Sequence, residues 1–316
     1  MMELVVLDAA SIGKDLDYSG FRRFGNLTIY DETTPQAIPE RVENADVLIL
    51  NKVRLSREVL SCAKKLRLIC EAATGYDNID LSYCRERGIA VCNVVGYSTQ
   101  SVAQLTVAMA LSLICKLGIY RPFVASGEYT RAGRPNLLEP VYHEIAGKTW
   151  GILGYGNIGK QVGKVAEALG CKILATKRTP TSEVACVSLD ELCRQSDILS
   201  IHTPLNDGTR NLLNRDRIAL LKKDCIVINV ARGAVTDESA LAEAILKGKI
   251  GGLGVDVYSR EPFPEDHPFQ SIKDLPNVLF TPHMAWGAYE TRVRLLSEMV
   301  ENARAFFAGE IRNRVD

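Results

Sequence analysis

Residues 149–170 read TWGILGYGNIGKQVGKVAEALG, an apolar run followed by a glycine-rich turn and then by apolar residues at helical spacing. This order predicts a buried strand, a tight loop and a helix. Gly154 and Gly156 let the backbone turn and approach a pyrophosphate, and Gly159 lets the helix pack closely on the strand. Amide groups at the start of such a helix bind phosphate. The stretch therefore predicts a dinucleotide site, the alternative being a glycine turn without a ligand.

The next predicted strand, CKILA at 171–175, is followed by Thr176, Lys177 and Arg178. An acidic side chain at this place accepts hydrogen bonds from the adenosine ribose of NAD. Lys and Arg instead attract a 2′-phosphate, and Arg can bind it through two donors. NADP is therefore favoured over NAD, with a solvated basic turn beside an NAD site as the alternative.

Short runs rich in Val, Ile and Leu recur on both sides of this stretch and alternate with longer helix-like segments. Strands without polar alternation are typical of parallel sheets that helices cover on both faces, so the fold class is α/β with two doubly wound parallel sheets. A long helical stretch over 98–118 interrupts this alternation of strands and helices, and an amphipathic helix over 289–309 follows the last strand. The other expected strands are LVVL (4–7), DVLIL (46–50), LRLIC (66–70), IAVCN (89–93), DILSI (197–201), DCIVINV (224–230), LGVDV (253–257) and NVLFT (277–281).

Composition and charge exclude several classes of protein. The chain has 316 residues with 38 basic and 38 acidic side chains, which argues against a nucleic-acid partner and, at this length, for two domains. The start, MMELVVLDAA, lacks the basic region of a secretory signal, and no apolar stretch is uninterrupted enough to span a membrane. We therefore expect a cytoplasmic protein with no membrane partner. The scattered cysteines and histidines predict no metal site, and His143 and His267 are expected at the surface.

Three polar residues follow predicted strands in the second half of the chain, at the edge where open α/β sheets bind ligands. Arg232 follows DCIVINV, Glu261 follows LGVDV, and His283 follows NVLFT. Hydride transfer to a carbonyl needs a proton donor, a cation for a substrate carboxylate and a group that orients the donor. A carboxylate beside an imidazole stabilises its protonated form. The three residues together therefore match what such a reaction requires.

Five segments in order resemble one known family, the D-isomer-specific 2-hydroxyacid dehydrogenases. They are GYGNIG (154–159), VINVARGAVTDE (227–238), GVDVYSREP (254–262), TPHMAW (281–286) and ATGYDNIDL (73–81), and the resemblance extends over nearly the whole chain. It implies a flavodoxin-like substrate domain made of residues 1–98 and 286–316. A Rossmann NAD(P)-binding domain, residues 99–285, is then inserted into it. A homodimer through the central domain is also implied.

The resemblance also implies roles for individual residues. Arg232 corresponds to the arginine that grips the substrate carboxylate and carbonyl oxygen, His283 to the acid or base, and Glu261 to its partner. Thr74 and Gly75 belong to the loop whose backbone amides hold the substrate carboxylate. The implied further contacts to the cofactor are Asn157, Ile158, Thr203, Pro204, Val230, Ala231 and, near the nicotinamide amide, Asp256.

Within the family, the segments around Lys52, over 96–111 and around Trp286 most resemble glycerate dehydrogenases and hydroxypyruvate or glyoxylate reductases. Lys52 is expected to donate to a polar substrate and Trp286 to close one wall of the site, unless either is a packing residue. The predicted reaction is reduction of hydroxypyruvate or glyoxylate to the D-2-hydroxy acid. The alternatives are a short phosphoglycerate dehydrogenase, a D-lactate-type enzyme, or a corepressor-like scaffold that binds dinucleotide and partner peptides.

Overall fold

The computed structural model describes residues 1–179 and 181–316. The chain divides into two compact units, which are Met1–Ser98 with Gly287–Asp316 (unit 1) and Thr99–Trp286 (unit 2). Each unit is built on its own parallel sheet, of five strands in unit 1 and seven in unit 2, so the predicted fold class is confirmed. The predicted assignment of substrate and dinucleotide to separate domains stays a prediction.

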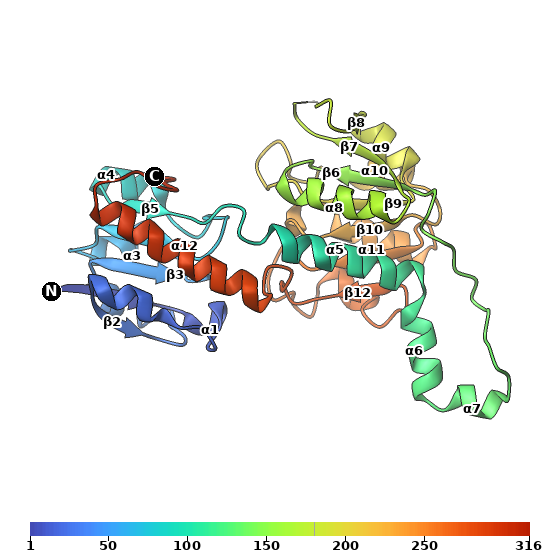
Figure 1. Ribbon diagram of the computed structural model, residues 1–316, viewed down its shortest axis with the longest axis horizontal. Coiled ribbons are helices and arrows are strands. Elements are labelled where there is room, and N and C mark those ends of the chain that lie inside the picture. Colours follow the sequence, from blue (N-terminus) through green and yellow to red (C-terminus); the bar gives the residue numbers. More distant parts are fainter. Residues whose placement is uncertain (180) are drawn as a thin grey trace. The chain divides into compact units, whose positions relative to one another are not determined.

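Unit 1 has strand order β2-β1-β3-β4-β5, with all pairs parallel. Helices α2, α3 and α4 cover one face of this sheet. Helix α12 packs against β4 (Figure 1). The elements are β1 (Met2–Val6), α1 (Ala9–Ile12), η1 (Tyr18–Phe24), β2 (Gly25–Ile29), α2 (Ile38–Val42), β3 (Val47–Leu50), α3 (Arg57–Cys62), β4 (Leu68–Glu71), α4 (Leu81–Arg87), β5 (Ala90–Cys92) and α12 (Tyr289–Phe307).

Unit 2 has strand order β12-β11-β10-β9-β6-β7-β8, again all parallel. The order reverses between β6 and β9, and ligands bind outside the carboxyl ends of strands at such a reversal. The elements are α5 (Thr99–Ile114), α6 (Leu117–Ala125), α7 (Glu128–Ala132), β6 (Thr149–Leu153), α8 (Asn157–Ala168), β7 (Lys172–Thr176), β8 (Ala185–Cys186), α9 (Leu189–Gln195), β9 (Ile198–Ile201), α10 (Arg215–Leu220), β10 (Ile226–Asn229), η2 (Gly233–Val235), α11 (Glu238–Leu246), β11 (Gly252–Val255), η3 (Pro268–Ser271) and β12 (Val278–Phe280).

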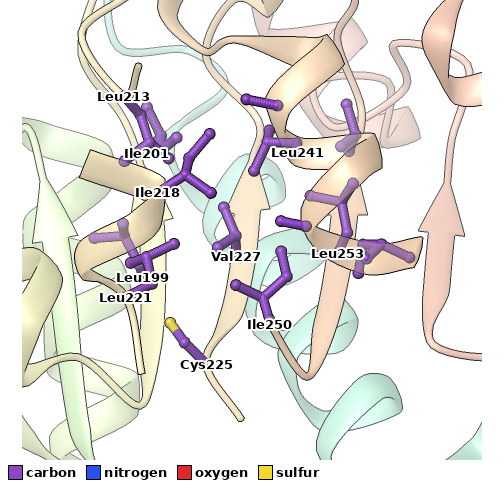
Figure 2. Packing of buried hydrophobic residues seen from close by; sticks show 14 of the residues in the cluster. Leu199, Ile201, Leu213, Ile218, Leu221, Cys225, Val227, Leu241, Ile250 and Leu253 are labelled. Carbon is purple, nitrogen blue, oxygen red and sulfur yellow. The ribbon is translucent and has the colours of Figure 1, made fainter. Parts of the chain in front are cut away.

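The sheet of unit 2 is covered on both faces. On one face, Val227 and Leu253 of the sheet pack with Ile218 of α10 and Leu241 of α11, as Figure 2 shows. On the other face, α5 and α8 pack on a cluster that includes the fully buried Trp150 of β6. Helices on both faces explain why the strands of this sheet are continuously apolar.

The long helix expected over 98–118 is instead two helices. Lys116 adopts a left-handed backbone conformation with φ of +55°, which ends α5 before α6 begins at Leu117. Neither α6 nor α7 has a buried residue, and both project from the body of unit 2 (Figure 1). Within the described residues, no single helix is long and apolar enough to cross a membrane; α5 and α6 pass such a test only as a pair bent by 69°.

Candidate active site

The backbone of the glycine loop after β6 packs closely against itself and against the segment that follows β9. Gly154 has φ of +98°, and a Cβ there would lie 2.8 Å from the backbone nitrogen of Thr203. A Cβ on Gly159 would lie 2.3 Å from the carbonyl oxygen of Gly154. Only glycine fits both positions, since a side chain at either would collide with backbone.

The start of α8 beside this loop is open. Gly156 is the N-cap residue, and its backbone is followed by helix amides that no side chain caps. A Cβ on Gly156 would meet no atom of the described residues within 4 Å. Asn157 beside it is exposed, and Ile158 is half-buried. Uncapped amides at a helix start bind anions, so this cradle fits the pyrophosphate of a dinucleotide.

The basic pair predicted to select the cofactor lies where β7 ends, next to β6 in the sheet. Lys177 is half-buried and Arg178 is exposed. Within residues 1–179 and 181–316, neither side chain forms an ion pair with a carboxylate. Thr203 and Pro204 follow β9, and Val230 and Ala231 follow β10, so these predicted cofactor residues also lie at the carboxyl edge of the sheet.

Arg232, Glu261 and His283 follow three neighbouring strands. In the sheet β10 pairs with β11, with Asn229 opposite Val255, and β11 pairs with β12. Because the three strands are parallel, the segments that carry the three side chains leave the sheet at the same edge.

His283 and Glu261 are in direct contact. The Nδ1 atom of His283 lies 2.6 Å from Oε2 of Glu261, and Oε1 of Glu261 accepts the amide of Tyr258 at 2.9 Å. The side chains are 24% and 31% exposed, so the pair is accessible at the edge of the sheet. Since Nδ1 faces the carboxylate, Nε2 is the ring atom that can face a substrate.

The backbone of His283 is held by Asp256, which is fully buried. His283 has φ of +53°, a left-handed conformation that costs a non-glycine residue about 1–2 kcal/mol. The Asp256 carboxylate accepts Thr281 Oγ1 at 2.6 Å and the amides of Met284 and Ala285 at 2.8 and 2.9 Å. Burial raises the pKa of Asp256, and these hydrogen bonds oppose that rise. The role of Asp256 near the nicotinamide stays a prediction, because the contacts observed are with the His283 loop.

Arg232 stands on a turn fixed by Asn229. The Asn229 side chain donates to the Arg232 carbonyl at 2.9 Å and accepts the Ala231 amide at 3.0 Å. The Arg232 guanidinium donates to the Ala231 carbonyl at 2.8 Å and, within the described residues, forms no ion pair with a carboxylate. The positive charge of the guanidinium is therefore available to bind an anionic ligand.

The remaining predicted substrate residues, except Trp286, belong to unit 1. The Lys52 side chain is exposed, and its amide donates to the buried Asp8 carboxylate at 2.6 Å. Thr74 is exposed, and its hydroxyl donates to the carbonyl of Val94 at 2.8 Å. Gly75 follows it in the same loop. In unit 2, Trp286 is half-buried and packs against the cluster beneath α5 and α8.

Sequence reasoning missed several buried polar residues around these loops. His267, which we expected at the surface, is only 7% exposed and lies 3.0 Å from Glu238 Oε2, whereas His143 is exposed as expected. His202 contacts Ser200 Oγ at 3.0 Å, and burial lowers the pKa of His202 to about 3. Charged residues at helix starts usually face solvent, so nothing local in the sequence marked Glu238 as buried.

The chain matches the family described as "D-isomer specific 2-hydroxyacid dehydrogenase, NAD binding domain" over residues 107–285. The chain belongs to this family. It is 36% identical to a glycerate dehydrogenase of Methylorubrum extorquens over 91% of each chain. It is 35% identical to a hydroxypyruvate reductase of Blautia hydrogenotrophica over 100% of each.

Among solved structures, a D-lactate dehydrogenase of Aquifex aeolicus complexed with NAD and lactic acid superposes with a TM-score of 0.85. It is 30% identical, over 98% of this chain and 96% of that one. This D-2-hydroxyacid dehydrogenase is therefore an NAD(P)-dependent oxidoreductase, and the family predicted from the five motifs is confirmed.

Proposed function

We propose that this dehydrogenase reduces hydroxypyruvate or glyoxylate to the corresponding D-2-hydroxy acid. The observation that carries the proposal is the 2.6 Å contact between His283 and Glu261, at the sheet edge where Arg232 also lies. Bound NAD(P)H supplies the hydride that adds to the carbonyl carbon. His283 gives a proton from Nε2 to the carbonyl oxygen, which completes the hydroxyl group.

Glu261 and Arg232 act on this step in different ways. Glu261 accepts from Nδ1 of His283, which fixes the orientation of the ring and stabilises its protonated form before transfer. Arg232 binds the substrate carboxylate and carbonyl oxygen and stabilises the negative charge that develops on that oxygen. A guanidinium is suited to this because it offers two parallel donors.

Unit 1 is proposed to hold the substrate carboxylate through the backbone of the Thr74–Gly75 loop. Lys52 is proposed to contact a polar substituent at the third carbon, and Trp286 to exclude water. Support for Lys52 comes from its backbone: Asp8 accepts the Asn51 amide at 3.0 Å and the Lys52 amide at 2.6 Å, which fixes the turn that carries the side chain.

The dinucleotide is proposed to bind unit 2, with its pyrophosphate at Gly154, Gly156, Asn157, Ile158 and Gly159. Lys177 and Arg178 are proposed to bind the 2′-phosphate of NADP, which makes NADP the favoured cofactor. The proposed remaining contacts are Thr203, Pro204, Val230, Ala231 and Asp256.

Initial rates of NADPH and NADH oxidation test the function directly. The substrates are hydroxypyruvate, glyoxylate, pyruvate and phosphohydroxypyruvate at matched concentrations near pH 7. We expect kcat/KM to be highest for hydroxypyruvate or glyoxylate with NADPH. A preference for pyruvate or phosphohydroxypyruvate would replace the substrate assignment, and a preference for NADH would overturn the cofactor assignment alone. Cofactor-dependent peptide binding without turnover would favour the scaffold.

The enzyme is further proposed to be a homodimer through unit 2. The segment 117–142, here called the arm, projects from unit 2 and carries exposed apolar side chains, among them Val124, Leu138 and Val141. Several exposed apolar side chains on one projecting segment favour an interface there. Sedimentation velocity should give a dimer, and Leu138→Glu with Val141→Glu should give a monomer. A monomeric wild type would contradict the proposal.

A further inference from the structure

Glu238 is a buried acid at the start of α11 to which neither the family resemblance nor the proposed mechanism gives a role. It is 9% exposed. Its Oε1 accepts the amide of Ser259 at 2.8 Å, its Oε2 accepts the Ser259 hydroxyl, and the same Oε2 lies 3.0 Å from Nε2 of His267. One carboxylate therefore binds three donors from the loop that follows β11.

The hydrogen bonds of His267 fix its tautomer. Its Nδ1 accepts the amide of Phe269 at 3.2 Å, so Nδ1 carries no proton and Nε2 donates to Glu238. The rings of Phe263 and Phe269 lie 5.2 and 5.0 Å from the imidazole, centroid to centroid. Glu238 is thus anchored to a histidine that packing holds in place.

Ser259, which binds Glu238, lies two residues before Glu261 in the sequence. The loop between β11 and η3 contains no helix or strand, so side-chain contacts fix its course. The amide of Tyr258 donates to Glu261 Oε1 at 2.9 Å. Tyr258 directly precedes Ser259, so the same stretch of backbone binds Glu238 and supports the Glu261 carboxylate.

The same backbone lies against the loop of Arg232. Gly233 follows Arg232, and a Cβ there would lie 2.0 Å from the carbonyl carbon of Tyr258 and 2.1 Å from the nitrogen of Ser259. The two loops therefore touch through backbone atoms, and Glu238 holds the Glu261 loop from the side of α11.

We propose that Glu238, through Ser259, is a positioning residue that sets where the Glu261 carboxylate meets His283 and how closely this pair lies to Arg232. The inference rests on the proposed function for its effect on turnover. Its effect on the geometry of the His283–Glu261 contact does not depend on which substrate the enzyme takes.

Three variants of the full-length enzyme test the inference. Glu238→Gln keeps one acceptor but cannot accept from all three donors, because its amide nitrogen only donates. Ser259→Ala removes the hydroxyl bond to Glu238 Oε2, keeps the amide bond to Oε1 and leaves α11 untouched. Asp237→Ala is the matched control: Asp237 caps the same helix by accepting the Ala240 amide at 2.9 Å, yet it makes no hydrogen bond to the Glu261 loop.

We expect Glu238→Gln and Ser259→Ala to lower kcat/KM for reduction by roughly 10- to 100-fold, the loss typical of a reacting group displaced by about 1 Å. The pH profile of kcat/KM should also change, because the Glu261 carboxylate no longer meets Nδ1 of His283 as it does in the wild type. The dissociation constant of NADPH or NADH should change less than about twofold, since the glycine loop is separate. Asp237→Ala should lower the melting temperature without moving the pH profile.

Proton NMR supplies a readout that does not need turnover. The Nδ1 proton of His283, held 2.6 Å from a carboxylate, should resonate far downfield; its loss in Glu261→Gln assigns it. The signal should disappear in Glu238→Gln and Ser259→Ala and persist in Asp237→Ala. A wild type that reduces no 2-oxo acid would refute the proposed function, while this signal would still decide the positioning role. Variants that keep both the signal and the wild-type pH profile would overturn the positioning role of Glu238. If Glu238→Gln does not fold, the result for Ser259→Ala is used alone.

Discussion

His283 and Glu261, separated by 22 positions in the sequence, meet at 2.6 Å through Nδ1 and Oε2. The contact exists because β11 and β12 are parallel neighbours whose following loops leave the same edge of the sheet. An imidazole held in this way presents its second nitrogen in a fixed direction, which is what proton transfer to a bound carbonyl requires.

His283→Ala should lower kcat for 2-oxo acid reduction by roughly 10²- to 10⁴-fold, the usual contribution of a positioned acid. Fluorescence titration with NADPH and NADH should give dissociation constants close to those of the wild type. Glu261→Gln should lower kcat less, because it leaves the imidazole in place and removes only the carboxylate that orients it. Wild-type turnover in His283→Ala would remove His283 as the proton donor.

The glycine loop offers a matched pair of substitutions. Gly154→Ala places a side chain on a residue with φ of +98° and 2.8 Å from backbone, so it should lower stability by roughly 1–3 kcal/mol. The side chain added in Gly156→Ala meets no atom within 4 Å in the described part of the chain, so the melting temperature should stay close to that of the wild type.

The dissociation constant of the dinucleotide should nevertheless rise at least about tenfold in Gly156→Ala, because the new methyl group enters the space that the pyrophosphate needs. Thermal unfolding and cofactor titration on both variants separate the two effects. Tight binding by Gly156→Ala would argue against a pyrophosphate at this loop.

Sequence reasoning succeeded where burial leaves a continuous apolar signal. Most inner strands of the two sheets are buried and were found, whereas the edge strands β2 and β8 were missed because they alternate or are short. The end of α5 was missed because Lys116, a residue with no helix-breaking chemistry, takes the left-handed conformation there.

Around the site, positions that depend on strand order were easier to predict than positions that depend on side-chain partners. Arg232, Glu261 and His283 follow neighbouring strands. Because these strands are parallel, the three residues lie at the same edge of the sheet. The burial of Glu238 and His267 depends on a contact across 29 positions between a helix start and an irregular loop, which no local pattern encodes. The contacts of Asp256 with the His283 loop were missed for the same reason.

Lys177→Ala with Arg178→Asp should reverse the cofactor preference. Removing two cations and adding a carboxylate at the end of β7 should raise KM for NADPH by roughly 10-fold or more and leave KM for NADH unchanged or lower. Steady-state kinetics with both cofactors at saturating 2-oxo acid measure the ratio of kcat/KM. Lys172→Ala, an exposed cation at the start of the same strand, is the control. An unchanged ratio in the double variant would mean that the basic pair is a solvated turn.

Glu71, at the end of β4, is 1% exposed; its Oε2 accepts Asn78 Nδ2 at 3.2 Å, while Oε1 has no partner among the described residues. Burial raises the pKa of Glu71 well above its ordinary value, and the Asn78 bond opposes this only in part. A raised pKa in the folded state stabilises the fold fully below the unfolded pKa, and this contribution is lost as pH rises toward the folded pKa.

Glu71→Gln removes this titration while keeping an acceptor for Asn78. The free energy of unfolding of the variant relative to the wild type should therefore increase as pH rises, by up to about 1.4 kcal/mol per pH unit until the folded pKa is passed. Urea unfolding of both proteins at several values between pH 5 and pH 9 measures the difference. Glu40→Gln, an exposed glutamate in α2, is the control and should give a nearly constant difference. A constant difference for Glu71→Gln as well would show that Glu71 is already ionised in the folded protein throughout this range.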